Sequence, residues 1–122
     1  QGGAAALAVA KRLKAARLAF VDAVDFIAAN SRANPNAAYA GSVPYLMLTG
    51  NLVAGWQMAR ALLIAETALA SGDCGDFGPA FMQSKITTAR FYADHILARA
   101  PAVRDAIVEG ADSVTALALE AF

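Results

Sequence analysis

The chain has 122 residues and no net charge, and 58% of its residues are hydrophobic while only 16% are charged. A chain of this length forms one domain, and zero net charge argues against a nucleic-acid partner because phosphate recognition needs a basic surplus. The single cysteine, Cys74, excludes an internal disulfide and fits a reducing compartment, for which we expect the cytoplasm. So much apolar surface predicts either a tightly packed bundle or a face that binds a partner.

The first predicted helix covers residues 4–32. Apolar side chains recur in it at helical spacing, in Leu13, Phe20, Val24 and Ile27. We expect it to end at Asn34-Pro35-Asn36, because the residue before a proline is pushed out of the helical region.

The second predicted helix runs from residue 37 to Ser71, with Gly72 as its C-cap. Pro44 lies inside it, so the helix either restarts there with Ser42 as N-cap or continues with a kink. We expect a long second helix kinked near Pro44.

No charged residue lies between Arg32 and Arg60, a stretch that includes the first two-thirds of the second predicted helix. Thr49, Asn51 and Gln57 interrupt the apolar run, which falls short of the roughly 18 residues of a membrane span. We therefore expect a buried central helix and no transmembrane segment. Small residues would allow close helix packing, with Gly50 and Gly55 as packing glycines; the stripe comprises Gly50, Ala54, Ala61, Ala65 and Ala68.

After a glycine-rich loop at residues 72–78, a third helix is predicted from Pro79 to about Ala100. A fourth is predicted from Pro101, and Gly110 would weaken it by about 1 kcal/mol relative to alanine. Its predicted apolar face comprises Val103, Ile107, Val114 and Leu117. No strand pattern is found in the sequence, so the expected fold is all-α, an up-down-up-down four-helix bundle.

We identify no catalytic, cofactor-binding or metal-binding residue. His95 is the only histidine, and Tyr92 stands three residues before it where a di-iron bundle would have glutamate. A zinc site needs more histidine or cysteine than the chain has. Cys74 and His95 lie near opposite ends of the third predicted helix, about 30 Å apart, which excludes a cysteine–histidine nucleophile pair.

Two segments resemble a known domain. They are Val43-Pro44-Tyr45-Leu46 with the following Gly55-Trp56 and Ala59-Arg60, and residues 89–102, which include Phe91-Tyr92-Ala93-Asp94-His95. They are similar to the C-terminal helical extension of large acyl-CoA dehydrogenases, particularly the type that acts on 3-methylmercaptopropionyl-CoA.

The resemblance implies that residues 1–122 form a single helical domain, a C-terminal fragment of a longer flavoenzyme. In that parent a glutamate base and FAD remove two hydrogens from the α,β bond of an acyl-CoA thioester. None of the family's catalytic or flavin-binding motifs matches a position here, so FAD is implied only in the parent. The implied partners are the catalytic core domains, the parent's acyl-CoA substrate and other copies in a homo-oligomer.

The fragment's own implied role is that of a structural docking module. The residues expected in the core or at the docking face are Tyr45, Trp56, Arg60, Arg90, Tyr92 and His95. For each of them ordinary bundle packing is the alternative, or surface charge in the case of the arginines. Two other functions stay open: a free-standing helical protein-interaction module that self-associates through the small-residue stripe, and a membrane-associated helical hairpin.

Overall fold

The protein is mainly helical in the part that the computed structural model describes, residues 3–122, and no strand occurs there, so the expected all-α class is confirmed. Three single 3₁₀ turns separate or follow the α-helices: η1 (Gly75–Phe77), η2 (Leu97–Arg99) and η3 (Leu119–Ala121). The α-helices are α1 (Ala4–Ala33), α2 (Pro35–Ala40), α3 (Ser42–Ser71), α4 (Gly78–His95), α5 (Ala100–Val108) and α6 (Ala111–Val114).

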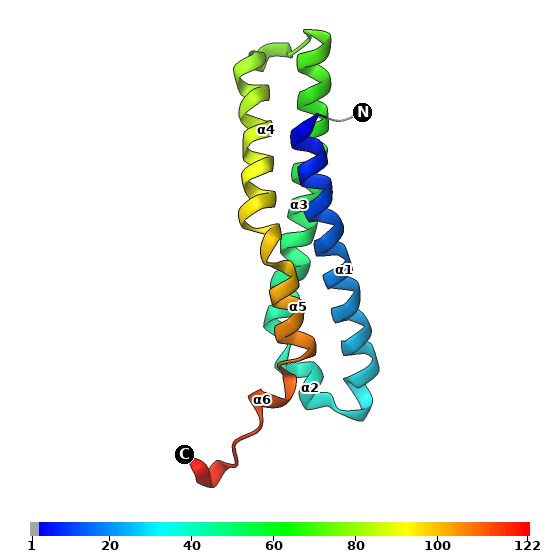
Figure 1. Cartoon of the computed structure of the whole chain (residues 1–122), viewed down its shortest axis with the longest axis vertical. Coiled ribbons are helices and arrows are strands. Elements are labelled where there is room, and N and C mark those ends of the chain that lie inside the picture. Colours follow the sequence, from blue (N-terminus) through cyan, green and yellow to red (C-terminus); the bar gives the residue numbers. More distant parts are fainter. Residues whose placement is uncertain (1–2) are drawn as a thin grey trace.

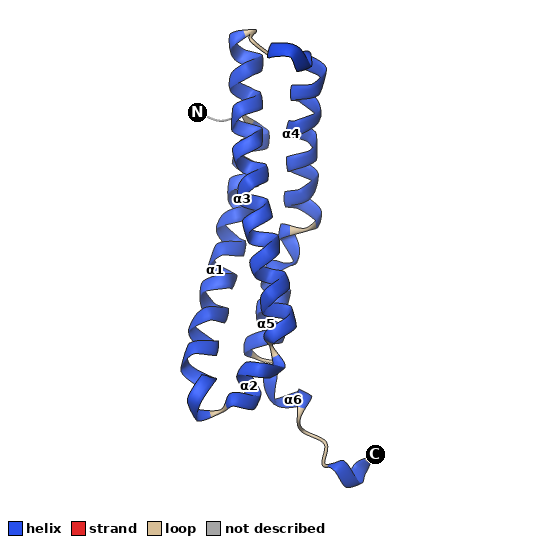
Figure 2. Cartoon of the chain, turned by 180° about the vertical axis from the view of Figure 1, so that it is seen from behind, coloured by secondary structure: helices blue, strands red, loops and turns tan. Residues whose placement is uncertain are grey.

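The helices form an elongated bundle of three rods. One rod is α1, the second is α3, which runs antiparallel to it, and the third is α4 followed by α5 in nearly the same line (Figure 1). α1 packs against α3, α4 and α5, and α3 also packs against α4 and α5, so each rod contacts the other two. The short helix α2 closes one end, and the segment after α6 extends beyond that end without returning to the bundle (Figure 2).

Alanines and a few larger aliphatic side chains fill the core between the rods. Ala16, Ala23, Ala89 and Ala93 are almost completely buried, and these small residues allow the helices to approach closely. The largest fully buried side chains are Leu48, Leu62, Leu97, Ile107 and Val9.

The predicted kink at Pro44 is wrong, because the chain breaks at Gly41 and α3 starts anew at Ser42. The carbonyl of Gly41 accepts the first helical hydrogen bond, from the Tyr45 amide at 2.9 Å, so Gly41 is the N-cap and Ser42 is not. Pro44 therefore occupies the first turn of α3, where amide groups have no helical partner and a proline removes no hydrogen bond.

The predicted third helix ends earlier than expected, at His95 instead of Ala100. Proline cannot donate to the carbonyl four residues before it, and η2 redirects the backbone in the turn that precedes Pro101. The 3₁₀ turn does not reverse the chain, and α5 continues in nearly the same line as α4 (Figure 1). The expected up-down-up-down order is therefore not found, because the third and fourth helices share one rod.

The predicted fourth helix ends at Val108. The amides of Glu109 and Gly110 both donate to the carbonyl of Asp105, at 2.8 and 3.2 Å, and this shared acceptor closes the helix. Val114 and Leu117 lie beyond the break and are about two-thirds exposed. They do not line one face with Val103 and Ile107, as the continuous helix would have required.

Candidate docking surface

One side of α3 is buried and the other is open. Leu48, Gly55 and Leu62 recur at seven-residue spacing and face the other rods. On the opposite side, apolar residues more than half exposed recur at three- and four-residue spacing. We define this outer face of α3 as Val43, Leu46, Met47, Gly50, Val53, Gln57 and Ile64, all exposed. The expected buried central helix is therefore only half found, because α3 is covered on one side only.

The two glycines predicted to permit packing behave differently. A Cβ atom on Gly55 would lie 2.7 Å from Leu97 Cδ2, so Gly55 does permit close packing inside the bundle. A Cβ atom on Gly50 would meet nothing within 4 Å. Gly50 is thus part of the outer face and serves no contact within the described chain.

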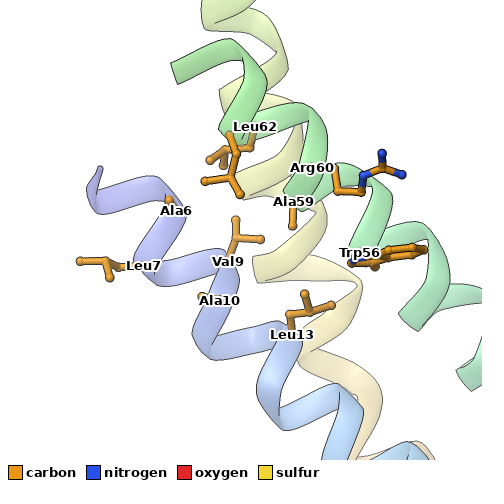
Figure 3. Close-up of a pocket in the computed structure, with 10 residues that line it drawn as sticks. Ala6, Leu7, Val9, Ala10, Leu13, Trp56, Ala59, Arg60 and Leu62 are labelled. Carbon is orange, nitrogen blue, oxygen red and sulfur yellow. The ribbon is translucent and has the colours of Figure 1, made fainter. Parts of the chain in front are cut away.

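An apolar groove of about 390 Å³ lies beside the outer face, between α1 and α3. In Figure 3, Val9 of α1 and Leu62 of α3 lie across from each other between the two helices, and Trp56 and Arg60 project side by side from α3. The groove is lined by Ala6, Leu7, Val9, Ala10, Leu13, Trp56, Ala59, Arg60, Leu62 and Leu63.

Trp56 and Arg60 form the polar rim of this groove. The Arg60 guanidinium carbon lies 5.4 Å from the centre of the Trp56 ring, in cation–π geometry, and Nη1 donates to Gln57 Oε1 at 3.2 Å. The indole is 52% exposed, which is unusually open for the largest apolar side chain in the protein. The site is therefore suited to burial against a partner surface.

The groove does not fit a flavin. Its lining is hydrocarbon apart from the Arg60 guanidinium and the Trp56 indole nitrogen, and a flavin dinucleotide needs several donors for its ring and phosphates. Within residues 3–122, no group of three or more His, Cys, Asp and Glu residues could hold a metal ion. Over the same residues, none of the helices is sufficiently long and apolar to span a bilayer.

Arg90 and His95 lie on α4, apart from this groove. Arg90 Nε donates to Asp94 Oδ2 at 2.6 Å, and Arg12 Nε of α1 lies 3.8 Å from Asp94 Oδ1. The hydrogen bond from Arg90, with the positive charges of both arginines, lowers the pKa of Asp94. The exposed His95 ring stacks at a tilt against Phe91, 4.5 Å between centres.

Tyr45 and Tyr92 are partly buried and face the core. The Tyr92 hydroxyl donates to the backbone carbonyl of Asn51 at 3.0 Å, which connects α4 to α3, and burial raises the pKa of Tyr92. The Tyr45 ring stacks on Phe20 of α1 with 5.8 Å between centres. Of the six residues singled out in the sequence, only Trp56 and Arg60 lie together beside the outer face.

Sequence reasoning missed the outer face itself. Leu46, Met47 and Val53 belong to a stretch predicted to be buried, yet they are the exposed part of it. The available signal was the lack of any charged residue between Arg32 and Arg60. A helix that is buried on one side only normally carries charged residues on its exposed side.

Comparisons with known proteins agree with one another. The sequence model of the family described as "Acetyl-CoA dehydrogenase C-terminal like" matches residues 3–118. The 3-methylmercaptopropionyl-CoA dehydrogenase of Ruegeria pomeroyi is 45% identical over 119 residues, which are 98% of this chain and 20% of that protein. The broad-specificity linear acyl-CoA dehydrogenase FadE5 of Mycobacterium tuberculosis is 36% identical over 67 residues, 55% of this chain and 11% of that protein. The chain thus spans one-fifth or less of these relatives, and no solved structure matches it significantly.

Proposed function

The chain belongs to the family of C-terminal domains of acyl-CoA dehydrogenases, and we propose that it is a structural docking module of such an enzyme. In this proposal, residues 1–122 are one helical domain of a longer FAD-dependent polypeptide that oxidises an acyl-CoA thioester. The observation that carries it is the 45% identity over 98% of this chain to a dehydrogenase that is about five times longer.

The chemistry falls to the rest of the parent enzyme. There a glutamate base would remove the α-proton of the acyl-CoA, and FAD, when bound, would accept the β-hydride. In this proposal residues 3–122 take part in neither step, and their groove offers hydrocarbon and a single guanidinium. Its own contribution is to bind the catalytic core domains and stabilise their arrangement.

The docking surface comprises the outer face of α3 and the rim formed by Trp56 and Arg60. Both are exposed, both lie on α3, and contiguous apolar exposure of this kind is typical of protein contacts. Arg90 and His95 are proposed as a second contact on α4, while Tyr45 and Tyr92 support α3 from within.

The other assignments follow from the family. We propose that the parent is a cytoplasmic homo-oligomer whose substrate is 3-methylmercaptopropionyl-CoA or a related acyl-CoA, the substrate type named for its Ruegeria relative.

The test is to purify the product of the native gene that contains this sequence and record its mass and visible spectrum. We expect a polypeptide several times heavier than 12.6 kDa, with flavin absorption that bleaches when acyl-CoA is added without an electron acceptor. A colourless product of 12.6 kDa would overturn the proposal. The exposed outer face of α3 would then favour the second candidate, a free-standing helical module that self-associates.

A further inference from the structure

We propose that a helix from the catalytic part of the parent polypeptide crosses the outer face of α3 at Gly50, with its backbone close to that of α3. This inference rests on the proposed function and extends it to a specific contact. It assigns Gly50 as the point of closest approach and Leu46, Met47 and Val53 as the side chains that surround it.

No close contact within the described residues requires glycine at position 50. Gly50 lies near the middle of the exposed face of α3, its φ is not positive, and a Cβ atom there would meet nothing within 4 Å. Glycine in a helix interior lowers helix stability relative to alanine. Gly41 and Gly55 show the contrast, since a Cβ atom at either would lie within 3.0 Å of the buried Ile107 or Leu97.

The surroundings of Gly50 form a notch that suits a helix. Leu46, Met47 and Val53 lie three or four residues from Gly50, so they stand around it on the same face, each more than half exposed. Helix axes normally pack 8–10 Å apart, and the distance depends on the side chains at the contact, so a glycine allows the shortest approach. The bulky neighbours would then fill the grooves on both sides of the crossing.

The crossing helix is assigned to the part of the parent polypeptide that lies outside this chain. About four-fifths of the Ruegeria relative has no counterpart here, and in one polypeptide such a segment is present at high effective concentration. Permanent interfaces are more apolar than transient ones, and the outer face carries no charged residue. That lack of charge also speaks against an anionic lipid surface, which is bound through lysine and arginine.

The decisive experiment uses the full native gene product with Gly50→Leu and Gly50→Ala. The matched control is Ala29→Leu, an exposed alanine of α1 located four and seven residues after Asp25 and Asp22 on the charged side of that helix. Thermal unfolding and kcat/KM for the acyl-CoA are measured for each variant. We expect Gly50→Leu to lower the Tm of the flavoenzyme by several degrees, Gly50→Ala to give no increase, and Ala29→Leu to have no effect.

In the 122-residue chain by itself, we expect Gly50→Ala to have the opposite effect on the Tm. Without the crossing helix, Gly50→Ala is expected to raise its Tm by about 3–6 °C, because the added methyl group has free space and alanine favours the helix. If Gly50→Leu and Ala29→Leu behave alike in the flavoenzyme, no helix crosses at Gly50. If instead the chain alone forms dimers that Gly50→Leu abolishes, the occupant is a second copy, and the inference is equally overturned.

The two proposals fail in different ways. A flavoenzyme that is indifferent to Gly50→Leu would leave the family function intact and remove only this contact. A colourless product of 12.6 kDa would remove the parent enzyme itself.

Discussion

The Leu97 side chain packs directly onto the backbone of Gly55, so closely that a Cβ atom on Gly55 would lie 2.7 Å from Cδ2 and 2.8 Å from Cδ1. Leu97 is the first residue of η2, the turn that joins α4 to α5 within the third rod. The contact therefore holds the third rod against α3 at the turn between α4 and α5. It also explains why glycine is needed at position 55 in the middle of a helix.

Gly55→Ala should destabilise the chain. Overpacking a filled core costs about 1–3 kcal/mol, which over most of that range exceeds the gain of about 1 kcal/mol in helix propensity. Leu97 is only 1% exposed, so its side chain would have to shift within the packed core. Urea denaturation monitored by circular dichroism measures the change, and Gly50→Ala is the control because it adds the same methyl group in open space. Equal stabilisation by both changes would contradict the close contact.

Tyr92→Phe should lower the free energy of unfolding by about 0.5–1.5 kcal/mol, because it removes the hydrogen bond to the Asn51 carbonyl. Burial raises the pKa of Tyr92 above 10.0, so the folded state favours the protonated hydroxyl. This stabilisation is fully present below pH 10.0 and is lost as the pH rises through the raised pKa of the folded state. Urea denaturation on both sides of that pH should show a smaller alkaline loss in Tyr92→Phe than in the wild type.

Tyr39→Phe serves as the comparison for that experiment, because Tyr39 is 70% exposed. It should leave the free energy of unfolding at neutral pH unchanged. A change as large as that of Tyr92→Phe would mean that hydroxyl burial is not the cause.

Asp94→Asn should remove part of the acid sensitivity of the fold. The Arg90 hydrogen bond, with the charges of Arg90 and Arg12, lowers the pKa of Asp94 below 3.8 in the folded state. The resulting stabilisation is present above pH 3.8 and disappears as the pH falls through the lowered pKa. Thermal unfolding across this acidic range should therefore show a shallower dependence in the variant.

Ionic strength gives an independent check on Asp94. Its side chain is 31% exposed, so added salt should screen the pair and reduce the difference between wild type and Asp94→Asn. Asp25→Asn, at an exposed site of α1, is the matched charge change. The ion-pair explanation does not survive if both variants respond to acid and salt in the same way.

Local sequence signals predicted the elements that depend on neighbouring residues. The expected helix at residues 4–32 is found as Ala4–Ala33, and Gly72 ends α3 with the left-handed φ of 76° that favours glycine. The i,i+4 pair of Arg90 and Asp94 forms as its spacing suggests.

The prolines were harder to interpret, because the effect of each depends on where its helix begins. Pro44 is harmless once Gly41 supplies the cap, whereas the turn before Pro101 changes direction without reversing it. The sequence does not show how far the chain turns there, and the structure shows Leu97 of that turn packed against Gly55. The expected up-down-up-down order required the chain to reverse at this turn.

The exposed outer face of α3 could not be predicted from the sequence for a different reason. Apolar residues occur on all sides of α3, so its periodicity gives no indication of which side is buried. Leu48 and Leu46 are equivalent in composition, yet one is 1% exposed and the other 68%. Only the positions of α1, α4 and α5 decide between them.

Trp56→Ala should destabilise the full native gene product more than it destabilises the 122-residue chain. In the chain the indole is 52% exposed, so its removal loses limited burial. At a docking interface, a tryptophan beside an arginine is the type of residue whose truncation costs about 2 kcal/mol or more. Thermal unfolding of both proteins, followed through flavin release in the longer one, measures the two losses.

Phe77→Ala provides the comparison, because Phe77 is a 69% exposed aromatic residue of η1, outside the groove and outside both proposed contacts. If docking uses the rim of the α1–α3 groove, Trp56→Ala should cause the larger loss in the full enzyme and release flavin at a lower temperature. Trp56→Phe should restore part of the stability, since a phenyl ring retains apolar area but loses some of the cation–π contact with Arg60. Equal losses for Trp56→Ala in the long and the short protein would place the indole in solvent in both and exclude this rim from the interface.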